Sequence, residues 1–179
     1  MTNLNLKMAG CALLLSMSCA NLDNLSITRT GKTLIKKNPT EIDFGVLEFS
    51  NLSEIDLNQI ASDNGRQLED IDSIKINSAI LDLPFPQNAN FDFAESIEFF
   101  VQADGVAPLK IASISPVPRN TKEITLDVAA VDLLNFSESR ILEITSRLVG
   151  TTPEFDTEVQ ATIDLEVDVD VTDAAGCNG

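Results

Sequence analysis

Apolar and polar residues alternate along much of the chain after Glu41, with the period of two that is typical of half-buried β-strands. The pattern is clearest in ATIDLEVDVDVT, residues 161–172. An Asp104-Gly105 pair predicts a tight hairpin between two neighbouring strands. Turn residues bound the other segments, and together these signals predict strands over residues 41–50, 71–85, 97–103, 109–115, 123–128, 139–150 and 157–172.

A helical pattern interrupts the strands in SEIDLNQIASDNG, residues 53–65. Ser53 can cap the N-terminus of a helix, Asp56 completes an S-x-x-D box, and Asn64-Gly65 predicts the end. The apolar residues of this segment are expected to face the core, and they are Ile55, Leu57, Ile60 and Ala61.

About seven strands without a strand–helix–strand rhythm predict an all-β, mainly antiparallel fold. We expect a β-sandwich with one short helix over residues 41–172, and a β-barrel is the alternative. Residues 19–40, rich in Asn, Ser and Thr, are expected to form a flexible tether, and residues 173–179 a disordered tail. Core packing is expected for Phe44, Phe49, Phe93, Phe99 and Phe155.

The first twenty residues, MTNLNLKMAGCALLLSMSCA, have the layout of a secretory signal peptide. Lys7 closes a polar region, the apolar stretch from Met8 to Met17 is too short to span a membrane, and small residues surround Cys19. A buried N-terminal helix is the alternative. The segment is similar to a bacterial lipoprotein leader, so we expect residues 1–18 to be removed and Cys19 to carry a lipid. Cleavage after residue 20 is the competing site.

Positive charge gathers in the expected tether. Between Asn24 and Thr40 there is no acidic residue, whereas the segment holds four of the chain's 12 basic residues, which are Arg29, Lys32, Lys36 and Lys37. Basic residues beside an anionic bilayer each add about 1 kcal/mol to binding. The segment is therefore either a membrane-facing basic stretch or a solvated linker.

Composition excludes several function classes. The formal net charge of −16 argues against nucleic acid, because phosphate binding needs clustered Lys and Arg. The chain has no His, which removes the commonest general base and the commonest transition-metal ligand. No nucleophile elbow, P-loop, dinucleotide-binding loop or CxxC motif occurs. We therefore expect no catalytic activity and no cofactor.

One line of carboxylates is a candidate metal site. On the strand over residues 157–172 they share one face, and they are Asp164, Glu166, Asp168 and Asp170. Residues two apart on a strand lie about 6.6–7 Å apart, which is wide for oxygens that calcium holds at about 2.3–2.6 Å. We expect the line to be a solvent face that also protects a strand edge from aggregation. A cation bound between this strand and its neighbour, or a basic protein partner, is the alternative.

Residues Ile71 to Thr172 resemble a group of bacterial exported proteins whose function is unknown. The likeness lies in the order of EDIDSIKINSAILDL, ESIEFFVQADG, KIASISPVP, EITLDV and EITSRLVGTTPEFDTEVQATIDLEVDV. It implies a sandwich-like domain behind a signal peptide or lipoprotein leader. We therefore expect an outer-membrane lipoprotein, facing the periplasm or the cell surface, that binds or scaffolds an unknown protein partner. The alternative functions are a secreted calcium-dependent binding module and, third, a carboxylate-based hydrolase. The alternative location is secreted, or soluble in the periplasm.

Overall fold

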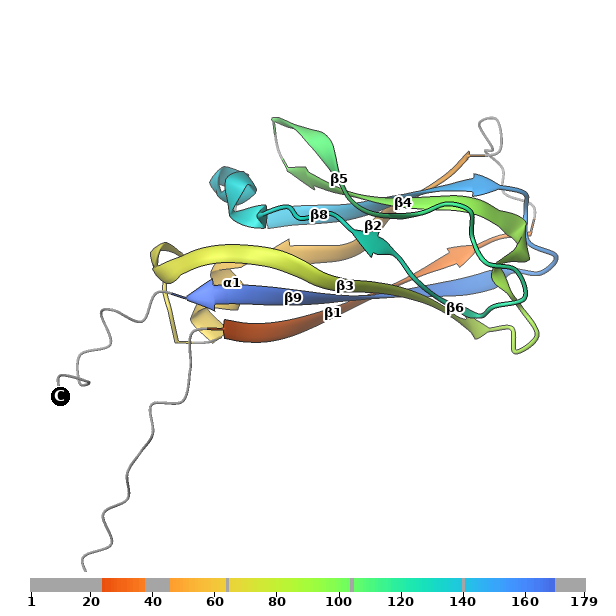
Figure 1. Ribbon diagram of the computed structural model, residues 1–179, viewed down its shortest axis with the longest axis horizontal. Coiled ribbons are helices and arrows are strands. Elements are labelled where there is room, and N and C mark those ends of the chain that lie inside the picture. The colour runs from red at the N-terminus through yellow and green to blue at the C-terminus, as the bar shows by residue number, and fades with distance from the viewer. Residues whose placement is uncertain (1–23, 38–45, 64, 104, 140, 170–179) are drawn as a thin grey trace, which may run out of the picture.

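The structure of the protein is a computed structural model that describes residues 24–37, 46–63, 65–103, 105–139 and 141–169. Two antiparallel sheets pack face to face over a shared apolar core (Figure 1). This confirms the predicted all-β sandwich. Because each sheet has its own strand order and two edges, the described strands do not close into the single ring that the barrel alternative requires.

The first sheet has four strands, all paired in antiparallel fashion. In spatial order they are β1 (Asn24–Ile35), β9 (Thr157–Val169), β3 (Ile71–Phe85) and β6 (Glu123–Thr125). The last strand of the chain, β9, thus lies in the middle of this sheet, between the first strand and the third.

The second sheet has five strands. In spatial order they are β2 (Val46–Asp56), β8 (Ile141–Gly150), β4 (Ala94–Ala103), β5 (Val106–Ile114) and β7 (Asp127–Val128). The predicted hairpin joins β4 to β5, with Gly105 at a φ of +74° in the connection. The predicted strand over 123–128 is divided, because β6 pairs with the first sheet and β7 with the second.

The short helices connect strands. α1 (Leu57–Asp63) follows β2, and three 3₁₀ turns are η1 (Leu68–Asp70), η2 (Phe91–Phe93) and η3 (Leu133–Ser139).

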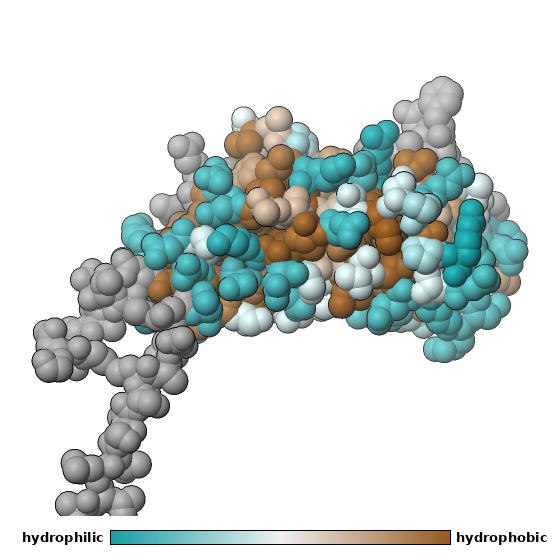
Figure 2. Space-filling model, in the orientation of Figure 1, coloured by the Kyte–Doolittle hydropathy of each residue, from teal (hydrophilic) through white to brown (hydrophobic). Residues whose placement is uncertain are grey.

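On the face drawn in Figure 2, apolar residues gather along the middle, between the two sheets, and hydrophilic residues cover both ends.

Strand β1 corrects the predicted tether. Residues 24–35 pair with β9 along their whole length, from Asn24 opposite Asp168 to Ile35 opposite Thr157. Leu25 and Ile27 pack against the core, and Ile35 is buried. The tether prediction was therefore wrong over these residues, because Asn24–Ile35 form a strand of the sandwich, which was predicted to start at residue 41.

The helix begins later than predicted. Ser53 to Asp56 continue β2 opposite β8, so Ser53 does not cap the helix. The cap is Asp56, whose Oδ1 accepts hydrogen bonds from the backbone N–H groups of Asn58 at 2.9 Å and Gln59 at 3.0 Å. The predicted apolar stripe is confirmed, since Ile55, Leu57, Ile60 and Ala61 are all buried.

The two ends of the sandwich differ. Because Asn24 lies opposite Asp168, the described chain starts and finishes at the same end, beside α1 (Figure 1). The connections from β3 to β4 and from β8 to β9 lie at the other end, which we call the tip. The strands between the ends measure about 40 Å, taking about 3.3 Å per residue along β9.

Candidate functional site

The acidic line runs along the outer face of the first sheet. Its inward neighbours Ile163, Leu165 and Val167 are at most 1 % exposed, which confirms the predicted faces of the strand. Asp164 and Asp168 are half-buried and Glu166 is exposed, whereas Asp170 lies outside the described residues. The line is on the solvent side of the sheet, but β9 is a central strand. The expected edge protection was therefore wrong.

Asp164 is held by hydroxyl groups from both neighbouring strands. Its Oδ1 accepts a hydrogen bond from Thr28 Oγ1 on β1 at 2.6 Å, and its Oδ2 accepts one from Ser78 Oγ on β3 at 2.7 Å. These two bonds stabilise the ionised carboxylate and hold the pKa of Asp164 below its ordinary value. The bond from Thr28 has the larger effect, and the bond from Ser78 the smaller one. Asp164 thus joins three strands and stays ionised at neutral pH.

The residues opposite Glu166 and Asp168 are polar or basic, and none of them is acidic. Glu166 lies opposite Ser26 on β1 and Lys75 on β3, and Asp168 lies opposite Asn24 and Ser73. Within the described part of the chain, no three His, Cys, Asp or Glu side chains come close enough together to hold a metal ion.

The basic residues of the expected tether are spread along β1 and beyond it. Arg29 lies mid-strand beside a shallow depression that Asp56 and Asp63 also line. Lys32 Nζ forms an ion pair with Glu158 Oε1 at 2.8 Å, on an exposed surface where such pairs contribute little. Lys36 and Lys37 follow β1 at the tip, about 40 Å from Asn24 along the strand. The four basic residues are therefore not gathered at the Asn24 end of β1, and the membrane-facing role stays a prediction.

Two further predictions lie outside the described residues, namely the leader with Cys19 and the tail over 173–179. Among the described residues no helix is long and apolar enough to cross a membrane.

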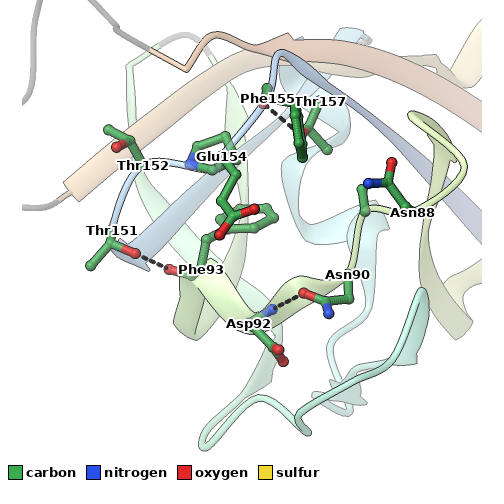
Figure 3. A pocket seen from close by; sticks show the side chains of 11 residues that line it. Asn88, Asn90, Asp92, Phe93, Thr151, Thr152, Glu154, Phe155 and Thr157 are labelled. Atoms are coloured by element: carbon green, nitrogen blue, oxygen red, sulfur yellow. Dashed lines mark hydrogen bonds between the residues drawn. The ribbon is translucent and has the colours of Figure 1, made fainter.

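A cavity of about 280 Å³ opens at the tip, and we call it the tip cavity. Two loops that are far apart in the sequence line it, one over residues 88–93 and the other over residues 151–157. In Figure 3 the Glu154 side chain reaches from the second loop into the space between the loops, and the Asn90 amide approaches from the first. An amide and a carboxylate from different loops thus face the same cavity.

One backbone hydrogen bond joins the two loops. The carbonyl oxygen of Phe93 accepts the Thr151 N–H at 2.7 Å. Gly150 makes this approach possible, since a Cβ atom at that position would lie 2.1 Å from the same oxygen. The buried hydroxyl of Thr157 donates to the Phe155 carbonyl at 2.8 Å, which fixes the end of the second loop. These two hydrogen bonds hold both ends of the second loop in place.

Hydrogen bonds of Asp92 connect the first loop to residues 119–120. Its Oδ1 accepts the backbone N–H of Asn120 at 2.7 Å, and its carbonyl oxygen accepts a hydrogen bond from the Arg119 guanidinium. Its backbone N–H donates to Asn90 Oδ1 at 3.1 Å. This leaves the NH₂ group of Asn90 for a ligand. Among the described residues, neither Asn88 nor the Glu154 carboxylate has a hydrogen-bonding or ion-pair partner.

The prediction that Phe155 packs in the core was wrong. Its side chain is 48 % exposed at the rim of the tip cavity, whereas Phe93 and Phe99 are buried as expected. Phe44 and the side chain of Phe49 lie outside the described part of the structure. The only sequence signal for the exposure of Phe155 is its place in a loop, next to Pro153 and between acidic residues.

Comparison with known proteins gives no family. No family model matches the sequence, and no curated protein matches it. Among solved structures, the chain is similar to a crystal structure of a decameric BFDV capsid protein, with 12 % sequence identity over 82 % of this chain and 97 % of that one. The TM-score is 0.38, so this likeness carries no argument about function.

Proposed function

We propose that this chain is an exported cell-envelope protein, held at the outer membrane through a lipid on Cys19, that binds a ligand at the tip cavity and catalyses no reaction. The observation that carries the proposal is the position of β1, which begins at the end of the sandwich opposite the tip cavity. An anchor before Asn24 would leave the cavity facing away from the bilayer.

The short distance in sequence supports this orientation. Cys19 precedes Asn24 by five positions, which can span at most about 18 Å even when fully extended. The strands then extend about 40 Å further to the tip. A lipid on Cys19 would therefore keep the α1 end close to the membrane. The tip cavity would then face the solvent on the side away from the bilayer.

The carboxylates favour binding over catalysis. Hydrolysis of a glycosidic bond by carboxylates needs two of them on the same bond, one with a raised pKa to act as an acid. In the tip cavity Glu154 faces the space, whereas the Asp92 carboxylate is engaged by the Asn120 N–H. The pKa of Asp164 is lowered by its two hydroxyl partners, which is the opposite of what a general acid requires.

Metabolic labelling with a fatty-acid analogue, followed by membrane fractionation, tests the anchor. We expect the wild-type chain to be labelled and to sediment with membranes, and Cys19→Ser to be unlabelled and soluble. Cys177→Ser is the matched control, because it removes a cysteine near the other terminus and should keep both label and membrane association. A Cys19→Ser protein that still partitions with membranes would contradict the lipid anchor.

A further inference from the structure

The structure points to a ligand class for the tip cavity, and we propose that it binds a single ring of a neutral glycan, with Phe155 as the surface on which the ring stacks. This inference deepens the proposed binding function but rests on the tip cavity alone, not on the lipid anchor. Three properties of the cavity carry it, which are its polar groups, its exposed aromatic ring and its size.

The polar groups suit hydroxyls. Asn88 offers an amide that both donates and accepts, the NH₂ group of Asn90 donates, and the Glu154 carboxylate accepts. Each hydroxyl of a sugar can both donate and accept a hydrogen bond, so amide donors beside a carboxylate acceptor can satisfy both capacities. These side chains lie on facing loops, and they would grip the edge of a ring from two sides (Figure 3).

The aromatic ring suits the apolar face of a sugar. Phe155 leaves 48 % of its surface in water, although its backbone is fixed by the hydrogen bond from Thr157. A pyranose ring has hydroxyls on its rim and C–H groups on its faces, so an aromatic ring beside hydrogen-bonding groups matches both parts. Covering the exposed part of Phe155 would add hydrophobic stabilisation to the polar contacts.

The size and charge of the tip cavity limit the ligand class to a small molecule that is not an anion. A volume of about 280 Å³ lies just below the range of about 300–1,000 Å³ that is usual for small-molecule sites, so one ring fits rather than a long ligand. Among the described residues no Lys or Arg lines the tip cavity itself, although Lys37 lines an adjoining depression that shares Glu154 and Phe155 with it. Inside the cavity the Glu154 carboxylate would repel an anion. A cation is the competing ligand, but Phe155 would contribute nothing to its coordination.

The absence of Trp and Tyr from the sequence allows a direct test. Phe155→Trp places a single indole at the rim of the tip cavity. Phe85→Trp is the matched control, since Phe85 is 60 % exposed at the end of β3 and does not line the cavity. The full-length chain is purified in a zwitterionic detergent without a sugar headgroup. Each variant is titrated with the neutral sugars maltotriose, cellotriose, mannotriose and triacetylchitotriose, and with trigalacturonic acid and calcium chloride.

We expect at least one neutral trisaccharide to change the fluorescence of Phe155→Trp saturably and to leave Phe85→Trp unchanged. Calorimetry on the wild-type chain should show the same sugar binding, and Phe155→Ala should weaken it by about tenfold or more while Phe85→Ala does not. If Phe155→Ala fails to fold, the indole titrations decide the matter alone. The proposal is overturned if no neutral sugar responds at about 10 mM, or if only calcium or the acidic sugar does. Either result would leave the anchor and its fractionation test untouched.

Discussion

Asp164 on the last strand accepts a 2.6 Å hydrogen bond from Thr28 on the first, across 136 positions of the chain. Ser78 on β3 donates to the other oxygen of the same carboxylate, so one side chain connects all three long strands of the first sheet. Stability should therefore depend on the ionisation of Asp164.

Acid should weaken this connection. The pKa of Asp164 is lowered in the folded protein, so its contribution to stability is fully present above the unfolded value of 3.8 and is lost as pH falls through the lowered folded value. We expect the double variant Thr28→Val, Ser78→Ala to lose less stability than the wild type on acidification, as measured by urea unfolding across a pH series. Thr30→Val is the control, because Thr30 lies opposite Thr162 rather than an acid. Parallel acid profiles for all three proteins would refute the role given to Asp164.

The two faces of β9 should respond differently to truncation. Leu165 is 0 % exposed, and removing a buried leucine side chain costs about 2–5 kcal/mol. We expect Leu165→Ala to reduce the free energy of unfolding by that amount, and Glu166→Ala, on the exposed side, to change it by less than about 0.5 kcal/mol. Chemical denaturation of both variants measures the difference, and equal losses would mean that the faces are misassigned.

Strand β1 offers a similar pair of neighbours. Ile35 is 2 % exposed and Leu34 is 52 % exposed. If β1 belongs to the sandwich, Ile35→Ala should destabilise the protein by about 2–5 kcal/mol and Leu34→Ala only slightly. A flexible tether would tolerate both changes. Thermal unfolding followed by circular dichroism separates these outcomes.

Gly150 should tolerate no side chain. The new Cβ atom of Gly150→Ala would clash with the Phe93 carbonyl and push the loops of the tip cavity apart. We expect a clear loss of thermal stability together with weaker ligand binding. Gly65→Ala is the control, because φ there is +68° with open space around it, so it should cost only the backbone strain of about 1–2 kcal/mol and leave the tip unchanged. Equal stability and binding in the two variants would contradict the close contact.

Calcium should have no specific effect on the acidic line. Millimolar calcium chloride should raise the melting temperature no more than sodium chloride of equal ionic strength, because screening alone relieves repulsion between like charges. A bound ion at about 100 times its dissociation constant would instead add about 2.7 kcal/mol. Differential scanning calorimetry distinguishes the two, and a calcium-specific rise that Asp168→Asn abolishes would establish a site.

The alternation of residues predicted the strands and faces of the described sandwich, because burial on one side of a sheet leaves a direct mark on the sequence. It failed for β1, where Arg29 and Gly31 occupy inward positions of an edge strand and break the apolar pattern. It also misplaced the start of α1, because Ser53 and Asp56 are equally good caps and only pairing with β8 decides between them.

The tip cavity could not have been predicted in the same way. Its two loops are about sixty residues apart, and they meet because β4 and β8 are neighbours in the second sheet. The sequence of each loop on its own is that of an ordinary polar connection between strands. The exposure of Phe155 likewise depends on the position of its loop relative to the sheets, which the local sequence does not specify.

The central place of β9 also determines when the protein can fold. Both β1 and β3 pair with this strand, so neither acquires its main partner until residues 157–169 have been synthesised. A chain still on the ribosome therefore has no complete first sheet, and pairing across such long sequence separations is slow. Under the export proposed above, this late closure would help the chain to remain unfolded until it has crossed the inner membrane.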